Sequence, residues 1–166
     1  MTAWRDGPET SEVAARARVL GACDACVAED ARRTTWPDPG ERTSVTSPDA
    51  AADLLVPGLL ERDRERCVAL LLDTKHRLIR QVTVSVGSVD HTFVNPREVY
   101  RDALLANASA LVLGHNHPSG DPEPSRDDEL VTRRVASAGQ VVGVELLDHL
   151  VVGAGRWVSL ARRGCL

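Results

Sequence analysis

The sequence predicts the α/β (α+β) fold class, with helices packed against a mixed β-sheet. Two observations support this prediction: short apolar runs of strand length alternate with longer segments of helical spacing, and capping residues precede several of those segments. The chain has 166 residues, of which 43% are hydrophobic and 3% aromatic, so we expect one domain with a core of valine, leucine and alanine.

The chain divides into a helical extension with a linker, residues 1–45, and a domain over residues 46–166. Ser11 can cap a helix that runs to about Arg32, because apolar residues recur there at helical spacing. The segment TTWPDPGERTSVTS that follows has the Pro, Gly, Ser and Thr content of a linker.

The domain is expected to begin with a helix and a β-hairpin. Ser47 and the proline after it form a helix start, and Pro57 with Gly58 is expected to interrupt that helix. The continuous apolar run CVALLLD, residues 67–73, predicts a strand covered on both faces. The segment HRLIRQVTVSVG, residues 76–87, alternates in its second half and predicts the antiparallel partner strand.

The rest of the domain is predicted to continue with a helix, a strand, a helix and two strands. Asn95 and the proline after it begin PREVYRDALLANA as a helix, and SALVLGH follows as a buried strand. Ser125 begins the helix RDDELVTRRVASAG, which Gly139 is expected to close. The segments QVVGVELLDHLVVG and RWVSLA are predicted as the last strands, joined by a glycine-rich turn.

Composition argues against several classes of protein. The formal net charge of −4 argues against a free-standing DNA-binding protein. No stretch approaches the roughly 20 apolar residues of a membrane span, and the N-terminus lacks the pattern of a secretory signal, so a cytoplasmic location is expected. Cys23 and Cys26 form a lone CxxC, which favours packing on the predicted helix over a zinc or redox site.

A pair of histidines, His115 and His117, stands at the end of the strand SALVLGH. Side chains two residues apart on an extended chain point the same way, so the two imidazoles are expected to lie together. The rigid segment PSGDPEP leads to the next helix, where Asp128 in the first turn can reach back to them. Two histidines and a carboxylate leave a fourth tetrahedral position for water, which predicts a catalytic site with a single zinc ion.

The same residues also have an interpretation that needs no metal. Ser125 and Asp128 match a capping box, with a serine at the N-cap and an acidic residue three positions later. The histidine pair, joined to that box by a rigid loop, favours the metal site. Both interpretations are compatible for Ser125, whose backbone can begin the helix while its hydroxyl faces the site.

The spacing His115-x-His117-x(7)-Ser125-x(2)-Asp128 resembles the JAMM (MPN+) metalloprotease motif, H-x-H-x(7)-S-x(2)-D. The segment NPREVYRDALLANASALVLGHNHPSGDPEPS and the ending LLDHLVVG with RWVSLARRG are similar to the RadC family. The similarity extends from about Ser44 to the C-terminus.

The resemblance implies a JAMM-type fold with cytidine-deaminase-like layering, a bound Zn²⁺ and machinery related to enzymes that cleave the isopeptide bonds of ubiquitin-like tags. By the motif, His115, His117 and Asp128 would bind zinc, and Ser125 would stabilise the tetrahedral intermediate. A peptide or protein substrate is then expected, in which a metal-activated water attacks the scissile carbonyl.

The JAMM pattern also requires a glutamate as general base, just before the first core strand. Glu65 occupies that place, and Glu98 on the helix before the metal strand is its rival. His149 in LDHL is retained in the manner of the family and is a candidate to hydrogen-bond a metal ligand.

Two functions compete with the peptidase: a DNA-associated repair or accessory factor, and a metal-dependent nuclease with the same ligands. The first needs a basic face, which arginines at positions 62, 64, 66, 133 and 134 supply only if they cluster. These arginines are interleaved with Asp and Glu, and residues 1–45 do not resemble the helix-hairpin-helix region usual in the family, so DNA is not favoured. The helical extension can cover the domain or form a homodimer seam, and both remain open.

Overall fold

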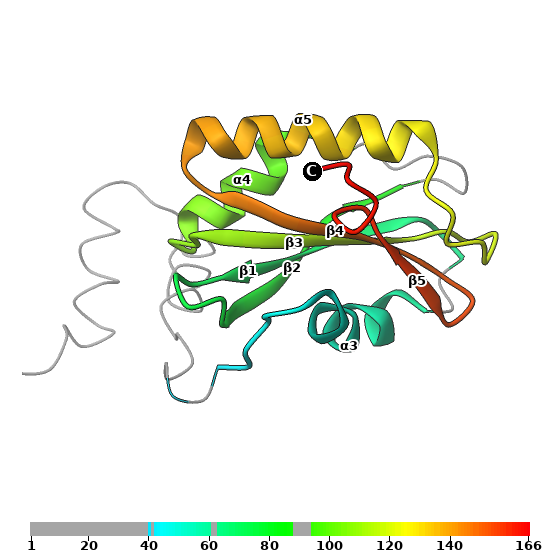
Figure 1. Ribbon diagram of the computed structural model, residues 1–166, viewed down its shortest axis with the longest axis horizontal. Coiled ribbons are helices and arrows are strands. Elements are labelled where there is room, and N and C mark those ends of the chain that lie inside the picture. Colours follow the sequence, from blue (N-terminus) through cyan, green and yellow to red (C-terminus); the bar gives the residue numbers. More distant parts are fainter. Residues whose placement is uncertain (1–39, 41, 61–62, 88–93) are drawn as a thin grey trace, which may run out of the picture. The chain divides into compact units, whose positions relative to one another are not determined.

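The computed structural model describes residues 40, 42–60, 63–87 and 94–166, which belong to one unit of the chain (Figure 1). The helix predicted to end at Arg32, and with it Cys23 and Cys26, lies outside these residues. The boundary predicted at residue 46 therefore stays a prediction.

The described elements follow the predicted order from the first helix of the domain to the last strand. The helices are α3 (Pro48–Leu59), α4 (Pro96–Leu105) and α5 (Arg126–Val142). The strands are β1 (Arg66–Leu72), β2 (Leu78–Val86), β3 (Ala110–Asn116), β4 (Glu145–Gly153) and β5 (Arg156–Ser159). None of the described helices is long and apolar enough to span a membrane.

The five strands form one mixed sheet in the order β2-β1-β3-β4-β5. β1 is antiparallel to β2 and to β3, and β4 is antiparallel to β5. β3 and β4 run parallel, with α5 as the connection between them. The mixed sheet and its helices confirm the predicted α/β (α+β) class.

Helices cover both faces of this sheet, with α4 and α5 on one side and α3 on the other (Figure 1). β1 shows the consequence, because its alternate side chains enter two separate apolar clusters. Cys67, Ala69 and Leu71 belong to the cluster that includes residues of α4 and α5. Val68, Leu70 and Leu72 belong to the cluster that includes residues of α3. The strand predicted from CVALLLD is therefore buried on both faces, as its continuous apolar run indicated.

The predicted helix starts are confirmed in atomic detail. The side chain of Ser47 accepts a hydrogen bond from the backbone N–H of Ala50, and that of Asn95 accepts one from Arg97. In both helices a proline follows the capping residue, where its missing N–H costs no intrahelical bond.

Two predicted helix ends were wrong. Pro57 and Gly58 do not interrupt α3, which continues to Leu59. The proline removes one backbone hydrogen bond in the last turn, whereas Leu55 and Leu59 on either side of it are fully buried beneath the sheet. Burial of these leucines therefore outweighs the lost hydrogen bond.

Gly139 does not close α5, which ends three residues later and is capped by Gly143 at φ 75°. Gly139 is needed for packing instead. A Cβ at this position would lie 2.3 Å from the hydroxyl of Tyr100 and 2.4 Å from the carbonyl oxygen of Val144. The Tyr100 hydroxyl donates to the carbonyl of Val135 at 2.9 Å, so the glycine lets α4 and α5 approach closely.

Candidate metal centre

β3 and the loop after it present the two histidines of the motif. His115 is 2% exposed and continues the row of Leu111 and Leu113, so its ring lies on the face covered by α5. His117 follows the end of β3 and is held there by a hydrogen bond from its backbone N–H to the carbonyl of Val152 on β4. The extended backbone thus brings both rings to one point, as predicted.

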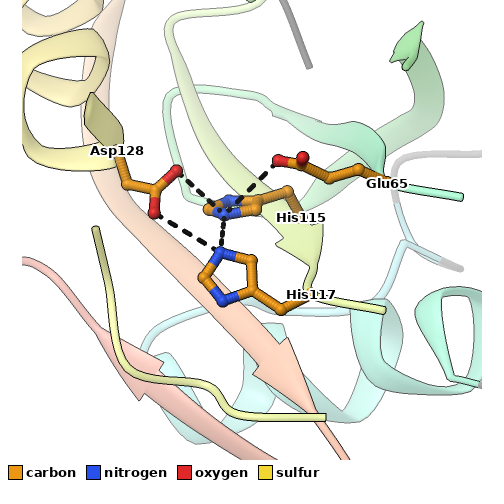
Figure 2. Close-up of side chains that lie close together, drawn as sticks. All are labelled: Glu65, His115, His117 and Asp128. Atoms are coloured by element: carbon orange, nitrogen blue, oxygen red, sulfur yellow. Dashed lines mark hydrogen bonds and ion pairs between the residues drawn. The ribbon is translucent and has the colours of Figure 1, made fainter. Parts of the chain in front are cut away.

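Two further carboxylates complete a group at this point (Figure 2). Glu65 lies just before β1, and Asp128 lies in the first turn of α5. One ligand atom from each of Glu65, His115, His117 and Asp128 lies within 4.8 Å of all the others, which is close enough to hold a metal ion.

The capping box of α5 orients Asp128 toward the histidines. The Ser125 hydroxyl donates to Asp128 Oδ2 at 2.6 Å and accepts from the Asp128 backbone N–H at 3.1 Å. The Ser125 backbone N–H also donates to Oδ2 at 2.7 Å. The other oxygen, Oδ1, is directed at His115 Nε2, 3.2 Å away. The two interpretations of this segment therefore coincide, because the cap holds the carboxylate in place for the site.

The loop after His117 fixes which nitrogen of that ring faces the site. His117 Nδ1 lies 2.8 Å from the carbonyl oxygen of Asp121, and a carbonyl only accepts, so Nδ1 carries the hydrogen. Gly153 on β4 supports this loop, since a Cβ there would lie 2.6 Å from the carbonyl oxygen of Gly120. In the neutral ring, Nε2 is therefore left without hydrogen and points into the group.

The distances between the potential ligand atoms are close to those of a tetrahedral site, with a different oxygen of Asp128 nearest to each histidine. His115 Nε2 and His117 Nε2 are 3.0 Å apart, and they lie 3.2 and 3.4 Å from the two oxygens of Asp128. Neighbouring ligand atoms of a tetrahedral zinc ion lie roughly 3.3–3.4 Å apart, from metal–nitrogen distances of about 2.0–2.1 Å. Glu65 Oε1 is 4.0 Å from His115 Nε2, beyond such an edge. The group therefore divides into three ligands and one carboxylate set farther back.

Protons compete with a metal ion for this group. The contact with Asp128 raises the pKa of His117, although burial acts in the opposite direction. Burial alone would raise the pKa of Asp128, but its contacts with His115 and His117 hold that pKa well below its usual range. The raised pKa of His117 means that a proton on this ring competes with a metal ion for Nε2, and a metal ion that binds there must displace it.

Asn116, the residue between the two histidines, fixes the backbone on both sides of Glu65. Its side-chain oxygen accepts from the Arg66 backbone N–H at 2.9 Å, and its side-chain nitrogen donates to the Arg64 carbonyl at 3.1 Å. The carbonyl of Glu65 also accepts from the backbone N–H of Gly87 at 2.8 Å. These bonds hold the Glu65 backbone beside the strand that carries His115.

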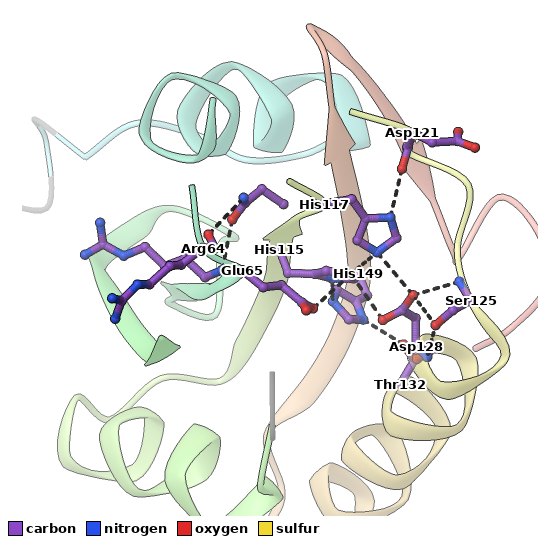
Figure 3. A network of polar contacts seen from close by, with 11 residues as sticks. Arg64, Glu65, His115, His117, Asp121, Ser125, Asp128, Thr132 and His149 are labelled. Atoms are coloured by element: carbon purple, nitrogen blue, oxygen red, sulfur yellow. Dashed lines mark hydrogen bonds and ion pairs between the residues drawn. The ribbon is translucent and has the colours of Figure 1, made fainter. Parts of the chain in front are cut away.

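A third histidine, His149, lies behind the ring of His115 (Figure 3). His149 on β4 is 1% exposed, and its Nε2 lies 2.8 Å from His115 Nδ1. Its Nδ1 lies 2.6 Å from the hydroxyl of Thr132, a fully buried residue of α5. Burial lowers the pKa of His149 well below its usual value, which favours the neutral ring. His149 thus contacts His115, one of the four residues that could hold a metal ion.

The structure separates the two candidates for the general base. Glu65 belongs to the group of potential ligands, whereas Glu98 is exposed in the first turn of α4 and is not part of it. Sequence reasoning did not identify Asn116 or Thr132. Thr132 lies four residues after Asp128 in a helix, which places both on one face, and this spacing was the available signal.

A cavity of about 440 Å³ opens beside His117, between the end of α3 and the turn that joins β4 to β5. Its lining is mainly apolar or small, with Leu59, Leu60, Val152 and Gly155 among its residues. Of the four residues of the group, His117 is the one that lines it.

Comparison with known proteins places the chain in a family. Residues 45–165 match the RadC-like JAB domain. The chain is 39% identical over 140 residues to a UPF0758 protein of Methanosarcina mazei, which covers 84% of this chain and 61% of that protein. It is 41% identical over 133 residues to a UPF0758 protein of Caldanaerobacter subterraneus subsp. tengcongensis, covering 80% and 57%.

A UPF0758 protein of Moorella thermoacetica is 44% identical over 125 residues, covering 75% of this chain and 55% of that protein. The chain therefore spans less than two thirds of the length of these relatives. The match over residues 45–165 includes the whole described sheet, its helices and the group around His115. The chain belongs to the RadC-like JAB domain family.

Proposed function

We propose that the protein is a zinc-dependent hydrolase that cleaves peptide or isopeptide bonds. The observation that carries this proposal is the division of the group: His115, His117 and Asp128 at the spacing of tetrahedral ligands, and Glu65 set back at 4.0 Å. Three protein ligands with an acid beside them are typical of catalytic rather than structural zinc. The family and the resemblance to the JAMM motif support the same proposal.

Each residue has a distinct role in this proposal. When bound, a zinc ion would supply an activated water and a positive charge that polarises the substrate carbonyl. The ion would be held by His115, His117 and Asp128. The negative charge of the Asp128 carboxylate would partly neutralise the charge of the ion. Glu65, positioned by Asn116, accepts the proton of the attacking water and returns it to the leaving amine.

Ser125 is proposed to stabilise the charge that develops on the substrate carbonyl oxygen. Its hydroxyl is already at the site, where it donates to Asp128 Oδ2. In the reaction it would turn toward the carbonyl oxygen, while the Ser125 backbone N–H continues to hold Asp128. A peptide or protein substrate, such as a protein joined to a ubiquitin-like tag, would approach through the cavity beside His117.

The test compares zinc-loaded wild type with Glu65→Gln on a mixture of peptides and isopeptide-linked peptides, with new termini detected by mass spectrometry. We expect cleavage by the wild type and a rate about 10²- to 10⁴-fold lower for Glu65→Gln, because the general base is lost. Zinc content should be equal in the two proteins, since Glu65 lies outside the ligand set. Glu98→Gln is the matched control and should keep the wild-type rate.

Equal cleavage by wild type and Glu65→Gln would contradict the assigned base. The same assay includes single- and double-stranded DNA, because the two alternative functions are compatible with the same metal ligands. A nuclease would use the metal for cleavage, and a DNA-associated factor would bind DNA without cleaving it. Zinc-dependent cleavage of DNA without cleavage of any peptide would replace the peptidase by the nuclease. Salt-dependent DNA binding without cleavage would favour the accessory factor.

A further inference from the structure

Thr132 and His149 form a buried polar pair between α5 and β4, behind the ring of His115 (Figure 3). Thr132 is 0% exposed and His149 is 1% exposed. A buried polar side chain is costly unless it is hydrogen-bonded, and both residues are fully bonded to each other and to their neighbours. The positions of their hydrogens determine which nitrogen of His115 is left without hydrogen.

The Thr132 hydroxyl determines the direction of the whole chain of hydrogen bonds. Its oxygen lies 2.6 Å from the carbonyl oxygen of Asp128 and 2.6 Å from His149 Nδ1. A carbonyl only accepts, so the single hydroxyl hydrogen lies between Thr132 and Asp128. The contact with His149 therefore requires a hydrogen on Nδ1, which donates to the threonine oxygen.

The position of the hydrogen on His149 determines the position of the hydrogen on His115. His149 is 1% exposed, and such burial disfavours a charged ring. A neutral ring with its hydrogen on Nδ1 accepts at Nε2, so His115 Nδ1 donates across the 2.8 Å contact. His115 Nε2 is then left without hydrogen. This is the atom that lies 3.0 Å from His117 Nε2 and 3.2 Å from Asp128 Oδ1.

The chain of hydrogen bonds runs from one metal-binding candidate to another. It starts at the ring of His115, passes through His149 and Thr132, and ends at the backbone carbonyl of Asp128. The Asp128 carboxylate faces His115 Nε2 at 3.2 Å, and two acceptors that face each other in this way leave a position for a cation. Two ligands from different elements, β3 and α5, are thus joined through β4. The geometry points to Thr132 and His149 as positioning residues that fix the tautomer of His115 and hold it in register with Asp128 for a divalent metal ion. This inference rests on the proposed metal site.

A purely structural role is the competing interpretation. A threonine in a helix often donates to the carbonyl four residues earlier, and a buried histidine often satisfies a core. On that interpretation the loss of the hydroxyl would lower stability and leave the metal affinity of the folded protein unchanged. Ser137 offers a matched comparison, because its hydroxyl donates to the carbonyl of Arg133 at 2.8 Å on the exposed face of the same helix.

The experiment measures zinc affinity by competition with a chromophoric chelator for wild type, Thr132→Val, Thr132→Ser and Ser137→Ala. We expect Thr132→Val to weaken affinity by about 10- to 100-fold, as is usual when a residue behind a ligand is lost. Thr132→Ser restores the hydroxyl and should regain the wild-type affinity, and Ser137→Ala should not change it. Circular dichroism establishes that each variant is folded.

A second readout keeps the inference testable if Thr132→Val does not fold. Spectra of ¹⁵N-labelled histidine in metal-free wild type should show His149 with its hydrogen on Nδ1. A hydrogen on Nε2 of His149, or unchanged zinc affinity in folded Thr132→Val, would overturn the inference. Failure of the proposed function is distinct, since it would appear as a wild type that binds no zinc.

Discussion

The two ends of β1 each carry an acidic residue in a polar cluster, and the clusters differ in how their charges are matched. Asp73 follows β1 at its C-terminal end, where Oδ1 accepts from the backbone N–H groups of Lys75 and Arg77 at 2.8 and 3.0 Å. Oδ2 accepts from the guanidinium groups of Arg77 and Arg42 at 2.9 and 3.2 Å. These contacts hold the pKa of Asp73 well below its usual range against the effect of burial.

At the other end of β1 acceptors converge on one point, although Asp128 Oδ2 also accepts two hydrogen bonds from Ser125. The Nε2 atoms of His115 and His117 face each other and the Asp128 carboxylate at 3.0 to 3.4 Å, and neither nitrogen carries a hydrogen when its ring is neutral. Such an arrangement is stabilised by a cation at its centre, whether a metal ion or a proton. A carboxylate surrounded by donors indicates a structural role, whereas converging acceptors indicate a binding site.

The largest effect expected from this difference is on the pH dependence of metal binding. Metal binding needs His117 without a proton on Nε2, and the pKa of His117 is raised by Asp128. Affinity should therefore fall roughly tenfold for each pH unit below that raised pKa, and level off above it. Asp128 stays ionised throughout, because its pKa is held far lower.

Zinc titrations from pH 8 down to about pH 5.5, with the protein folded at each pH, measure this dependence. A zinc affinity that does not change with pH would show that no proton is displaced, and would contradict the shared position of proton and metal. The Asp73 carboxylate stays ionised over this pH range, so it does not contribute to the pH dependence of the measured zinc affinity.

A smaller effect is expected at the other end of the strand. Asp73→Ala removes the carboxylate that accepts from two backbone N–H groups of the hairpin turn and from the guanidinium groups of Arg77 and Arg42, so the free energy of unfolding should fall by about 1–3 kcal/mol. Asp73→Asn keeps Oδ1 as an acceptor and should lose less. Urea denaturation measures both values.

Zinc stoichiometry should be the same in Asp73→Ala and wild type, because the cluster holds the hairpin turn and not the ligands. A folded Asp73→Ala that loses zinc would remove the distinction between the two ends of β1. It would mean that the ligands depend on the whole strand and not on their own local bonds.

The helix starts were predictable from sequence because they are local. Ser47, Asn95 and Ser125 each cap a helix through a hydrogen bond to a residue within three positions. The helix ends at Pro57 and Gly139 were not predictable, since they depend on burial of Leu55 beneath the sheet and on the approach of α4 to α5.

The residues of the candidate site also fall into two groups, those predictable from local sequence and those that only the fold brings together. His115 and His117 share one extended segment and Asp128 follows in a capping box, so spacing alone was enough to single them out. The contacts of Asn116 with Arg64 and of Thr132 with His149 join residues 52 and 17 positions apart. Only the order of strands and the placement of α5 bring these residues together, and no local pattern records that.

The most direct test of the metal site is the zinc content of the reconstituted protein, measured by elemental analysis for wild type and His117→Ala. His117 is only partly buried, so the variant should fold, as circular dichroism can verify. The arrangement of acceptors predicts about one zinc ion per chain in the wild type and almost none in His117→Ala. No zinc in the wild type, or equal zinc in both, would contradict the metal site and reduce Ser125 and Asp128 to a helix cap.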